Sequence, residues 1–525
     1  MPSRAKARSV NLLKAAATVS GFTLLSRITG LVRETLIATV FGASALTDAF
    51  FVAFRLPNML RRLFAEGAFS QAFVPMLTER KLQAEQGQHE AANAFVSRVA
   101  TALTWALILV TIAGMLGAPF LVWAMAAGLD APAEAAAILM TRWMFPYILL
   151  ISLVALAAGI LNTWKQFAIP AFTPVLLNLA MIGASLLLAS RLDPPVLALA
   201  AGVIAGGIAQ LALQLPALHR IGMLPRLGLN PFRAFADPDV RAIIIKMGPA
   251  VLAVSVAQIS LVINTHIASR LAAGSVSWVS FGDRLMEFPT ALLGVALGTV
   301  LLPSLARAGQ RNDTEEYSRL LDWGLRLCVV LSVPGMVGLA LMAEPLTALL
   351  FHYGRFDTHD VAMTRQAVLA YSAGLLGLIA VKVLAPGFYA RQDIRTPVKI
   401  ALVVLAATQL LNLAFVPWLQ HAGLALSISV AAWVNAALLL RGLLRNGTYR
   451  PGMGWLALAL KVLIAAAAMG VLLWLIVPRF DWISLQSSPM IRVALVLSIL
   501  AGAAGLYLTA LVLMGLRPRQ FLRRD

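Results

Sequence analysis

Charged residues are scarce in this chain of 525 residues, and acidic residues are especially few. Asp, Glu, Lys and Arg together make up 12% of the sequence, whereas about 25% is usual for a soluble domain. Hydrophobic residues make up 60%, and many segments reach the ~20 apolar residues that cross a bilayer. This composition excludes a soluble globular protein. We therefore predict an all-α polytopic membrane protein with about 14 transmembrane helices.

Groups that could do chemistry are also few. The single cysteine, Cys328, cannot form an internal disulfide, and the six histidines are dispersed. His352 and His359 share one predicted outer loop, where they would make a poor metal site. The sequence contains no phosphate-binding loop, dinucleotide-binding fingerprint or convincing nucleophile triad, and the predicted loops are too short for a soluble catalytic domain. We therefore predict that the protein is not an enzyme and has no metal or cofactor.

The basic residues follow a topological pattern. Of the 42 Lys and Arg, 26 lie at the N-terminus or in alternate loops on its side, four lie in the opposite loops, and twelve lie within predicted spans. This positive-inside pattern places both termini in the cytoplasm and explains most of the net charge of +19 without nucleic acid. Arg27 and Arg33 interrupt the first apolar run, so we interpret it as a retained span and not as a signal peptide.

Two halves of the sequence are similar. Arg55-Leu56 recurs as Arg284-Leu285, Gln166 before Pro170 recurs as Gln392 before Pro397, and the segment 176–180 recurs as 410–414. These anchors keep the same order and a nearly constant separation, which predicts a parallel repeat of two six-helix lobes around a central cavity. The predicted divisions are an N-lobe (1–217), a cytoplasmic linker at the membrane surface (218–240), a C-lobe (241–444) and two further helices (455–515).

Charges occur where predicted spans should be apolar. A charge at the bilayer centre costs roughly 2.5–3.5 kcal/mol on insertion scales, so such residues usually face a partner or a polar cavity. Two interpretations stay open: internal salt bridges between helices, or a cationic cavity for an anionic, phosphate-bearing substrate, since the planar guanidinium binds phosphate in a bidentate manner. The residues concerned are Arg27, Arg33, Arg55, Arg61, Arg62 and Arg284, with the acids Glu34, Asp48, Glu66, Asp283 and Glu287.

Other cations within spans have a simpler interpretation. Arg142, Arg326, Lys461 and Arg492 lie near span ends, where we expect their side chains to reach the membrane surface. Lys382 lies deeper in its span and is ambiguous.

Four segments carry a resemblance to a known family. DAFFVAFRLPN (48–58), FAEGAFSQAFVP (64–75), DRLMEFP (283–289) and VLAPGFY (383–389) are similar to the MurJ (MviN) family of the multidrug/oligosaccharidyl-lipid/polysaccharide exporter superfamily. The resemblance extends over nearly the whole chain. It implies two six-helix lobes, a central cavity, and a groove formed with the last two helices for a polyprenyl tail.

The resemblance also implies a function and a set of site residues. The function is alternating-access flipping of lipid II, the undecaprenyl-diphosphate-linked peptidoglycan precursor, across the bacterial inner membrane. Implied partners are lipid II, membrane lipids, and cell-wall synthesis and division proteins; coupling to the membrane potential, H⁺ or Na⁺ is expected. The implied cavity residues are Arg27, Arg33, Arg61, Arg284, Asn58, Glu66, Asp283 and Glu287, with Asp48 and Lys382 in gating or coupling. Arg55 and Arg62 are left as structural ion-pair members.

Three alternatives remain at this stage. Another member of the superfamily could export drugs or a different polyprenyl-linked glycan or amphiphile, although a drug-cation exporter would favour an acidic cavity. An integral-membrane enzyme acting on polyprenyl phosphates would need clustered catalytic residues, which the sequence lacks. A scaffold for cell-wall synthesis would not depend on Arg27 or Arg284.

Overall fold

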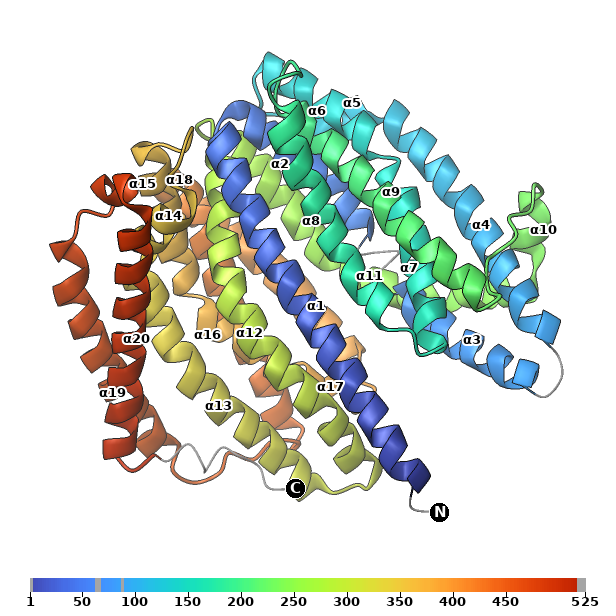
Figure 1. Cartoon of the computed structure of the whole chain (residues 1–525). Helices are drawn as coiled ribbons and strands as arrows, with labels where there is room; N and C mark the ends of the chain where they lie inside the picture. The colour runs from blue at the N-terminus through green and yellow to red at the C-terminus, as the bar shows by residue number, and fades with distance from the viewer. Residues whose placement is uncertain (1–2, 62–67, 86–88, 517–525) are drawn as a thin grey trace. The chain divides into compact units, whose positions relative to one another are not determined.

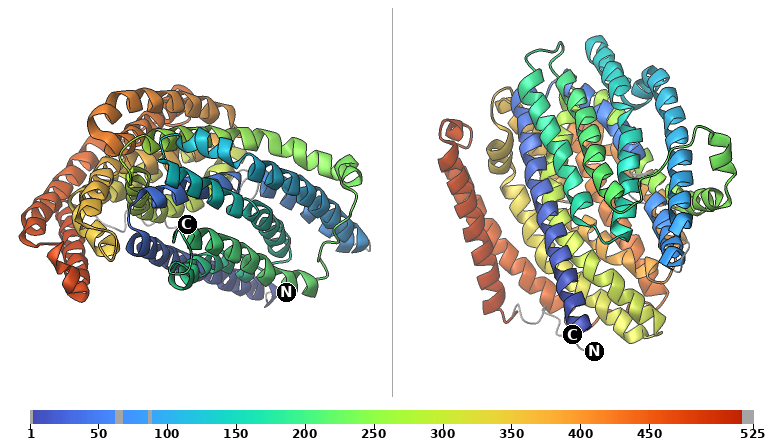
Figure 2. Two further views of the ribbon diagram at one scale, coloured as in Figure 1. Left: turned by 90° about the horizontal axis from the view of Figure 1, so that it is seen from above. Right: turned by 45° about the vertical axis from the view of Figure 1, so that its right-hand side comes forward.

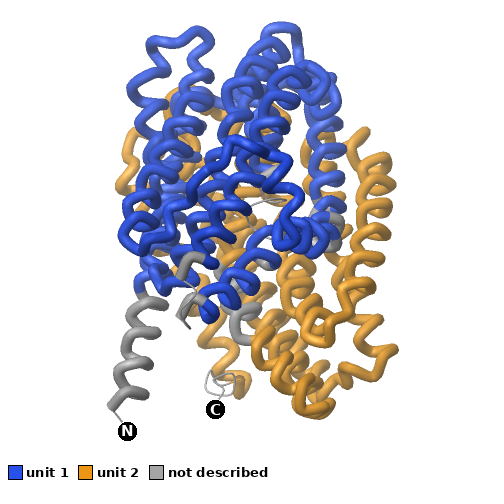
Figure 3. Tube along the Cα trace, turned by 90° about the vertical axis from the view of Figure 1, so that its right-hand side faces the viewer, with its two compact units in different colours: residues 1–273 blue, residues 274–525 orange. Residues whose placement is uncertain are grey.

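A computed structural model describes residues 3–61, 68–85 and 89–516. Every regular element in these ranges is a helix, which confirms the predicted fold class of an all-helical polytopic membrane protein. Contacts divide the chain into two compact units, residues 1–273 and 274–525 (Figure 3).

The first unit contains eleven of the helices described (Figure 1). They are α1 (Ser3–Phe41), α2 (Ala45–Arg61), α3 (Ala68–Glu85), α4 (His89–Leu116), α5 (Ala118–Ala126), α6 (Ala131–Met144), α7 (Tyr147–Thr163), α8 (Ala168–Leu188), α9 (Leu197–Arg220), α10 (Pro231–Ala236) and α11 (Pro238–Ser269).

The second unit contains nine further α-helices and two short 3₁₀ turns. The helices are α12 (Ser275–Gln310), α13 (Thr314–Leu341), α14 (Ala343–Phe351), α15 (Thr358–Ser372), α16 (Leu375–Leu384), α17 (Pro386–Tyr389), α18 (Arg395–Arg445), α19 (Trp455–Ile476) and α20 (Pro489–Leu513); the turns are η2 (Val477–Arg479) and η3 (Ser484–Ser487).

Within the described residues, eight helical segments are long and apolar enough to cross a membrane, or up to nine if one bent pair counts as a single span. That pair is α15 with the segment Leu375–Tyr389, bent by 43°. Helix α18 consists of two helical segments joined by a kink at Gln420, which has a positive φ of 51°. The total of about 14 stays a prediction.

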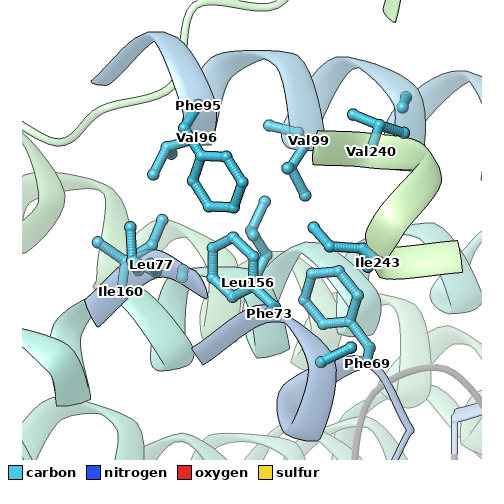
Figure 4. Close-up of a cluster of buried hydrophobic side chains, with 14 of the residues drawn as sticks. Phe69, Phe73, Leu77, Phe95, Val96, Val99, Leu156, Ile160, Val240 and Ile243 are labelled. Carbon is cyan, nitrogen blue, oxygen red and sulfur yellow. The ribbon is translucent and has the colours of Figure 1, made fainter. Parts of the chain in front are cut away.

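A cluster of buried hydrophobic side chains explains why α11 belongs with the first unit (Figure 4). Phe73 of α3 stacks on Phe95 of α4 with ring centroids 5.7 Å apart, and Val240 and Ile243 of α11 are buried in the same cluster. Within a bilayer, such side chains hold helices together mainly through close van der Waals packing. The unit boundary therefore follows α11, whereas the repeat in the sequence predicts a lobe boundary at the linker; the lobe boundaries stay a prediction.

The linker predicted at 218–240 runs along α4. The backbone N–H of Gly228 donates to Thr101 Oγ1 over 2.9 Å, and Trp105 Nε1 donates to the Gly228 carbonyl over 3.1 Å. Arg98 forms an ion pair with Asp237, whose side chain caps α11 by accepting from the N–H of Asp239. These contacts give the linker a defined path and join α4 to the start of α11.

The two halves of the sequence share a local backbone motif. Lys165 and Gln392 both have positive φ, 63° and 61°, and lie shortly after the ends of helices α7 and α17. In each case the next N–H reaches back to the last helical turn: Gln166 donates to Leu161, and Asp393 donates to Phe388. This is the hydrogen-bond pattern of a Schellman helix end. The motif pairs Lys165 with Gln392, one residue away from the sequence anchor, which pairs Gln166 with Gln392.

The last two long helices, α19 and α20, pack side by side within the second unit (Figures 1 and 2). The segment that leads into α19 is held in place by Asp322 of α13. The Asp322 carboxylate accepts hydrogen bonds from Tyr449 (2.8 Å), the Gly452 N–H (3.1 Å) and Trp455 (2.8 Å). Arg326 completes the group with an ion pair to Asp322 at 2.6 Å. One carboxylate thus ties the segment between α18 and α19 to α13.

Candidate functional site

Two buried charges lie next to each other on α1. Arg33 is 8% exposed and Glu34 is 4% exposed, and the two form an ion pair. Arg33 Nη1 also donates to Oδ1 of Asn178 on α8 over 3.0 Å, and Asn178 Nδ2 donates to the Ser26 carbonyl of α1 over 3.0 Å. A charge tolerates burial only when it is paired and hydrogen-bonded. Arg33 therefore fixes α1 against α8 through the neutral side chain of Asn178, whereas its ion pair stays within α1. Its role toward a substrate stays a prediction.

Arg27 has a different environment on the same helix. It lies six residues before Arg33, so the two side chains point about 120° apart on an ideal helix. Arg27 is exposed, and its neighbours Leu24 and Ile28 are 60% and 52% exposed. Among the described residues, Arg27 has no ion-pair or hydrogen-bond partner. On this apolar helix face it therefore presents a positive charge that no described acidic residue compensates.

Helix α2 carries two of the predicted site residues that the structure describes. Asp48 is 3% exposed in the first helical turn, where a negative charge is stabilised by the helix dipole. Asn58 is partly buried near the end of the helix. Arg55 donates to Thr265 Oγ1 of α11, which supports a structural role for Arg55.

Three predicted residues at this point of the chain cannot be assessed. The side chain of Arg61, at the end of α2, lies outside the described residues, and so do Arg62 and Glu66.

In the second unit, the charged residues of α12 are exposed. Arg284 Nη1 forms an ion pair with Glu287 Oε2 at 2.6 Å, with side chains 41% and 51% exposed. The spacing of three residues places both on one helix face. Asp283 is also exposed. The structure thus brings Arg284 and Glu287 together in a pair that a stronger anionic ligand could open.

Lys382 of α16 reaches the same helix α12. Its Nζ donates to the carbonyl of Thr290 over 3.2 Å, while much of the residue stays exposed. This carbonyl lies one helical turn after Glu287. A backbone movement of α12 near Pro289 would therefore alter the hydrogen bond of Lys382. Its assignment to gating or coupling stays a prediction.

One prediction for the cations at span ends is wrong. Arg492 does not reach the membrane surface: it is 0% exposed, donates to the carbonyls of Ala348 (2.7 Å) and Ile483 (3.2 Å), and lies over the Tyr353 ring. Ala348 lies in the last turns of α14, where the partial negative charge of the helix end stabilises a cation. Arg142 does remain exposed.

Sequence reasoning missed the neutral partners of these cations. In the sequence, Asn178 stands out only as part of the repeat segment 176–180, and no motif marks Thr265 or Thr290. A polar side chain inside an apolar span is the available signal, because hydrocarbon offers it no hydrogen-bond partner. Within the described residues, no group of three His, Cys, Asp or Glu side chains is arranged to hold a metal ion.

Comparisons with known proteins agree on one family. Residues 37–493 match the family described as "Lipid II flippase MurJ". The chain is 54% identical over 517 residues to the "Lipid II flippase MurJ" of Burkholderia cenocepacia, covering 98% of this chain and 100% of that protein. It is 39% identical to the "Probable lipid II flippase MurJ" of Haemophilus influenzae, covering 96% and 100%.

Solved structures show the same fold. A structure titled "Lipid II flippase MurJ, inward closed conformation" aligns with a TM-score of 0.77 at 23% identity, covering 94% of this chain and 99% of that one. An inward-facing multidrug resistance transporter of the MATE family aligns with a TM-score of 0.67 at 14% identity, covering 82% and 98%. At these identities the likeness concerns the fold alone.

Proposed function

Because the chain belongs to the MurJ family of lipid II flippases, we propose that it translocates lipid II from the cytoplasmic to the periplasmic leaflet for peptidoglycan synthesis. The protein is a multi-pass inner-membrane protein of a transporter family, not of an enzyme family. The positive-inside pattern supports cytoplasmic termini.

The main energetic cost of this transport is moving the charged head group across the bilayer. A diphosphate-linked sugar-peptide cannot cross hydrocarbon unaided at a useful rate, because unpaired charge is very costly there. Arginines within apolar helices lower that cost by providing charge-assisted hydrogen bonds to phosphate. The observation that carries the proposed transport function is the exposure of Arg27 on α1, where it has no partner among the described residues.

We assign different tasks to the charged residues. Arg27 of α1 and Arg284 of α12 are each assigned to bind phosphate groups of the substrate, because both are exposed. Arg33 holds α1 in place through Glu34 and Asn178. Glu287 competes with the substrate for the Arg284 guanidinium, so that the head group can leave after it has bound.

The transport cycle follows from these tasks. The head group enters from the cytoplasmic side, the polyprenyl tail stays in lipid, and a change of access releases the head group on the other side. Asp48 and Lys382 take part in gating, and the membrane potential or a gradient of H⁺ or Na⁺ supplies the energy. Lipid II and the surrounding lipids are the partners of this step.

The test measures the accessibility of labelled lipid II to a membrane-impermeant reagent outside the cell. Cells are depleted of the protein and then resupplied with the wild type, Arg27→Ala or Arg284→Ala. The wild type should restore labelling, and both variants should leave the precursor inside. Arg319→Ala, which removes a 68% exposed arginine of an i,i+3 pair on α13, is the matched control and should restore labelling.

Two results would overturn the proposal. Full restoration by both arginine variants would indicate a scaffold. Flipping of a different polyprenyl-diphosphate glycan, but not of lipid II, by the purified protein in proteoliposomes would identify another substrate.

A further inference from the structure

Three helices of the first unit line an open, apolar groove of about 490 Å³. Met115 of α4, Trp143 of α6, and Ile204, Ala205 and Ile208 of α9 contribute to its wall. Each of these residues lies in a helix that is long and apolar enough to cross a membrane. The groove is therefore at membrane depth, and its occupant must be apolar for most of its length.

The walls suit a flexible chain. The small side chain of Ala205 keeps the groove open beside α9, while Ile208 and Trp143 are 54% and 39% exposed along it. Burying such apolar surface against an acyl chain gains packing contacts that a rigid, flat helix face would not offer. Trp at this position is also typical of the boundary between hydrocarbon and head groups.

One charged residue, Arg142, lines the groove. Among the described residues it has no ion-pair or hydrogen-bond partner, and no acidic residue lines the groove. A lone guanidinium beside an apolar channel matches a molecule with one anionic head and a hydrocarbon tail. A zwitterionic head group would bring an ammonium for which the lining offers no carboxylate.

We propose that this groove binds an anionic phospholipid, with the phosphate on Arg142 and an acyl chain between α4, α6 and α9. The residues of α6 and α9 that line it follow predicted outer loops, and Met115 lies near the outer end of α4, so the lipid belongs to the outer leaflet. This site is separate from the charged residues of α1 and α12 and concerns a lipid that is not transported.

The test measures lipid binding directly. The purified protein is titrated with phosphatidylglycerol or phosphatidylethanolamine and examined by native mass spectrometry. Arg142→Gln should weaken phosphatidylglycerol binding about tenfold, which corresponds to about 1.4 kcal/mol. It should weaken phosphatidylethanolamine binding less, because the ammonium of that lipid already offsets its phosphate charge. Arg191→Gln, an exposed outer-side arginine of the same unit that does not line the groove, is the matched control and should have no effect.

A second readout locates the acyl chain. Phosphatidylglycerol with brominated acyl chains should quench the part of the fluorescence that Trp143→Phe removes, and Ala205→Phe should abolish this quenching by filling the groove. Equal losses of phosphatidylglycerol binding in Arg142→Gln and Arg191→Gln would show unspecific attraction and overturn the proposal. Unaltered binding in Arg142→Gln, or unaltered quenching in Ala205→Phe, would also overturn it.

Discussion

Replacing Glu287 by Gln should tighten the binding of the head group and slow transport. The Arg284–Glu287 pair is short, at 2.6 Å, but its side chains are 41% and 51% exposed. Solvent screening therefore limits its value to the 0.2–1 kcal/mol usual for exposed pairs. Gln keeps the size of the side chain and removes its charge. The substrate then no longer competes with Glu287 for Arg284.

The expected magnitude follows from this range. A change of 0.2–1 kcal/mol corresponds to a roughly 1.5- to 5-fold increase in lipid II affinity. Related complexes differ mostly in dissociation rate, so release should slow by a similar factor. Equilibrium binding of lipid II to the protein in nanodiscs measures the first effect. The flipping rate in proteoliposomes, followed by outside labelling of the head group, measures the second.

Glu316→Gln provides the control, because it removes the acid of another i,i+3 pair on a different helix, with Arg319. It should change neither quantity. Unchanged affinity and rate in Glu287→Gln would refute the reasoning. Weaker binding would show that Glu287 holds the substrate instead of competing with it.

Three further predictions concern stability. Asn178→Leu removes the hydrogen bonds to Arg33 and α1 and should lower the free energy of unfolding by about 1–3 kcal/mol, as a buried donor loses its acceptor; a calorimetric or fluorescence melt in detergent measures this, and an unchanged melting temperature would contradict it. Arg492→Ala leaves a void beneath α20 and should cost about 2–4 kcal/mol, whereas Arg365→Ala, at a half-exposed side chain, should cost little in the same melt. Burial opposes the ionised form of Asp237, but the hydrogen bond and charge of Arg98 outweigh it and lower its pKa below 3.8. The stabilisation is therefore present above pH 3.8 and is lost as the pH falls through the lower folded-state pKa. Between pH 5 and 8, protonation of Asp237 should not change the rate of hydrogen exchange at the start of α11. Asp237→Asn should increase this exchange rate throughout that range.

The fold class could be predicted from the sequence because it depends on composition, and apolar length alone determines which helices can span a membrane. The Arg284–Glu287 ion pair could also be predicted from the sequence, because side chains three residues apart are neighbours on the surface of a helix. The helix ends at Lys165 and Gln392 were marked by the repeat, although their positive φ was not anticipated.

Burial around a helix could not be predicted in the same way. Arg492 lies near a span end in the sequence, which gives its depth but not the neighbours on its side of the helix; α14 supplies the carbonyl that allows full burial. Arg27 and Arg33 share one apolar segment of the sequence, but their spacing places them on different helix faces. The partner of Arg33, Asn178, is far away in sequence and meets it only because α8 packs on α1.

The matched helix ends at Lys165 and Gln392 have a practical consequence for protein engineering. A residue with a side chain costs about 1 kcal/mol or more in the left-handed region, where glycine fits without strain. Because both positions have φ near 60° in the two copies of the duplicated segment, Lys165→Gly and Gln392→Gly can be introduced together as a symmetric pair. Such a pair offers a route to a more heat-resistant sample for biochemical work that leaves the charged helix faces untouched.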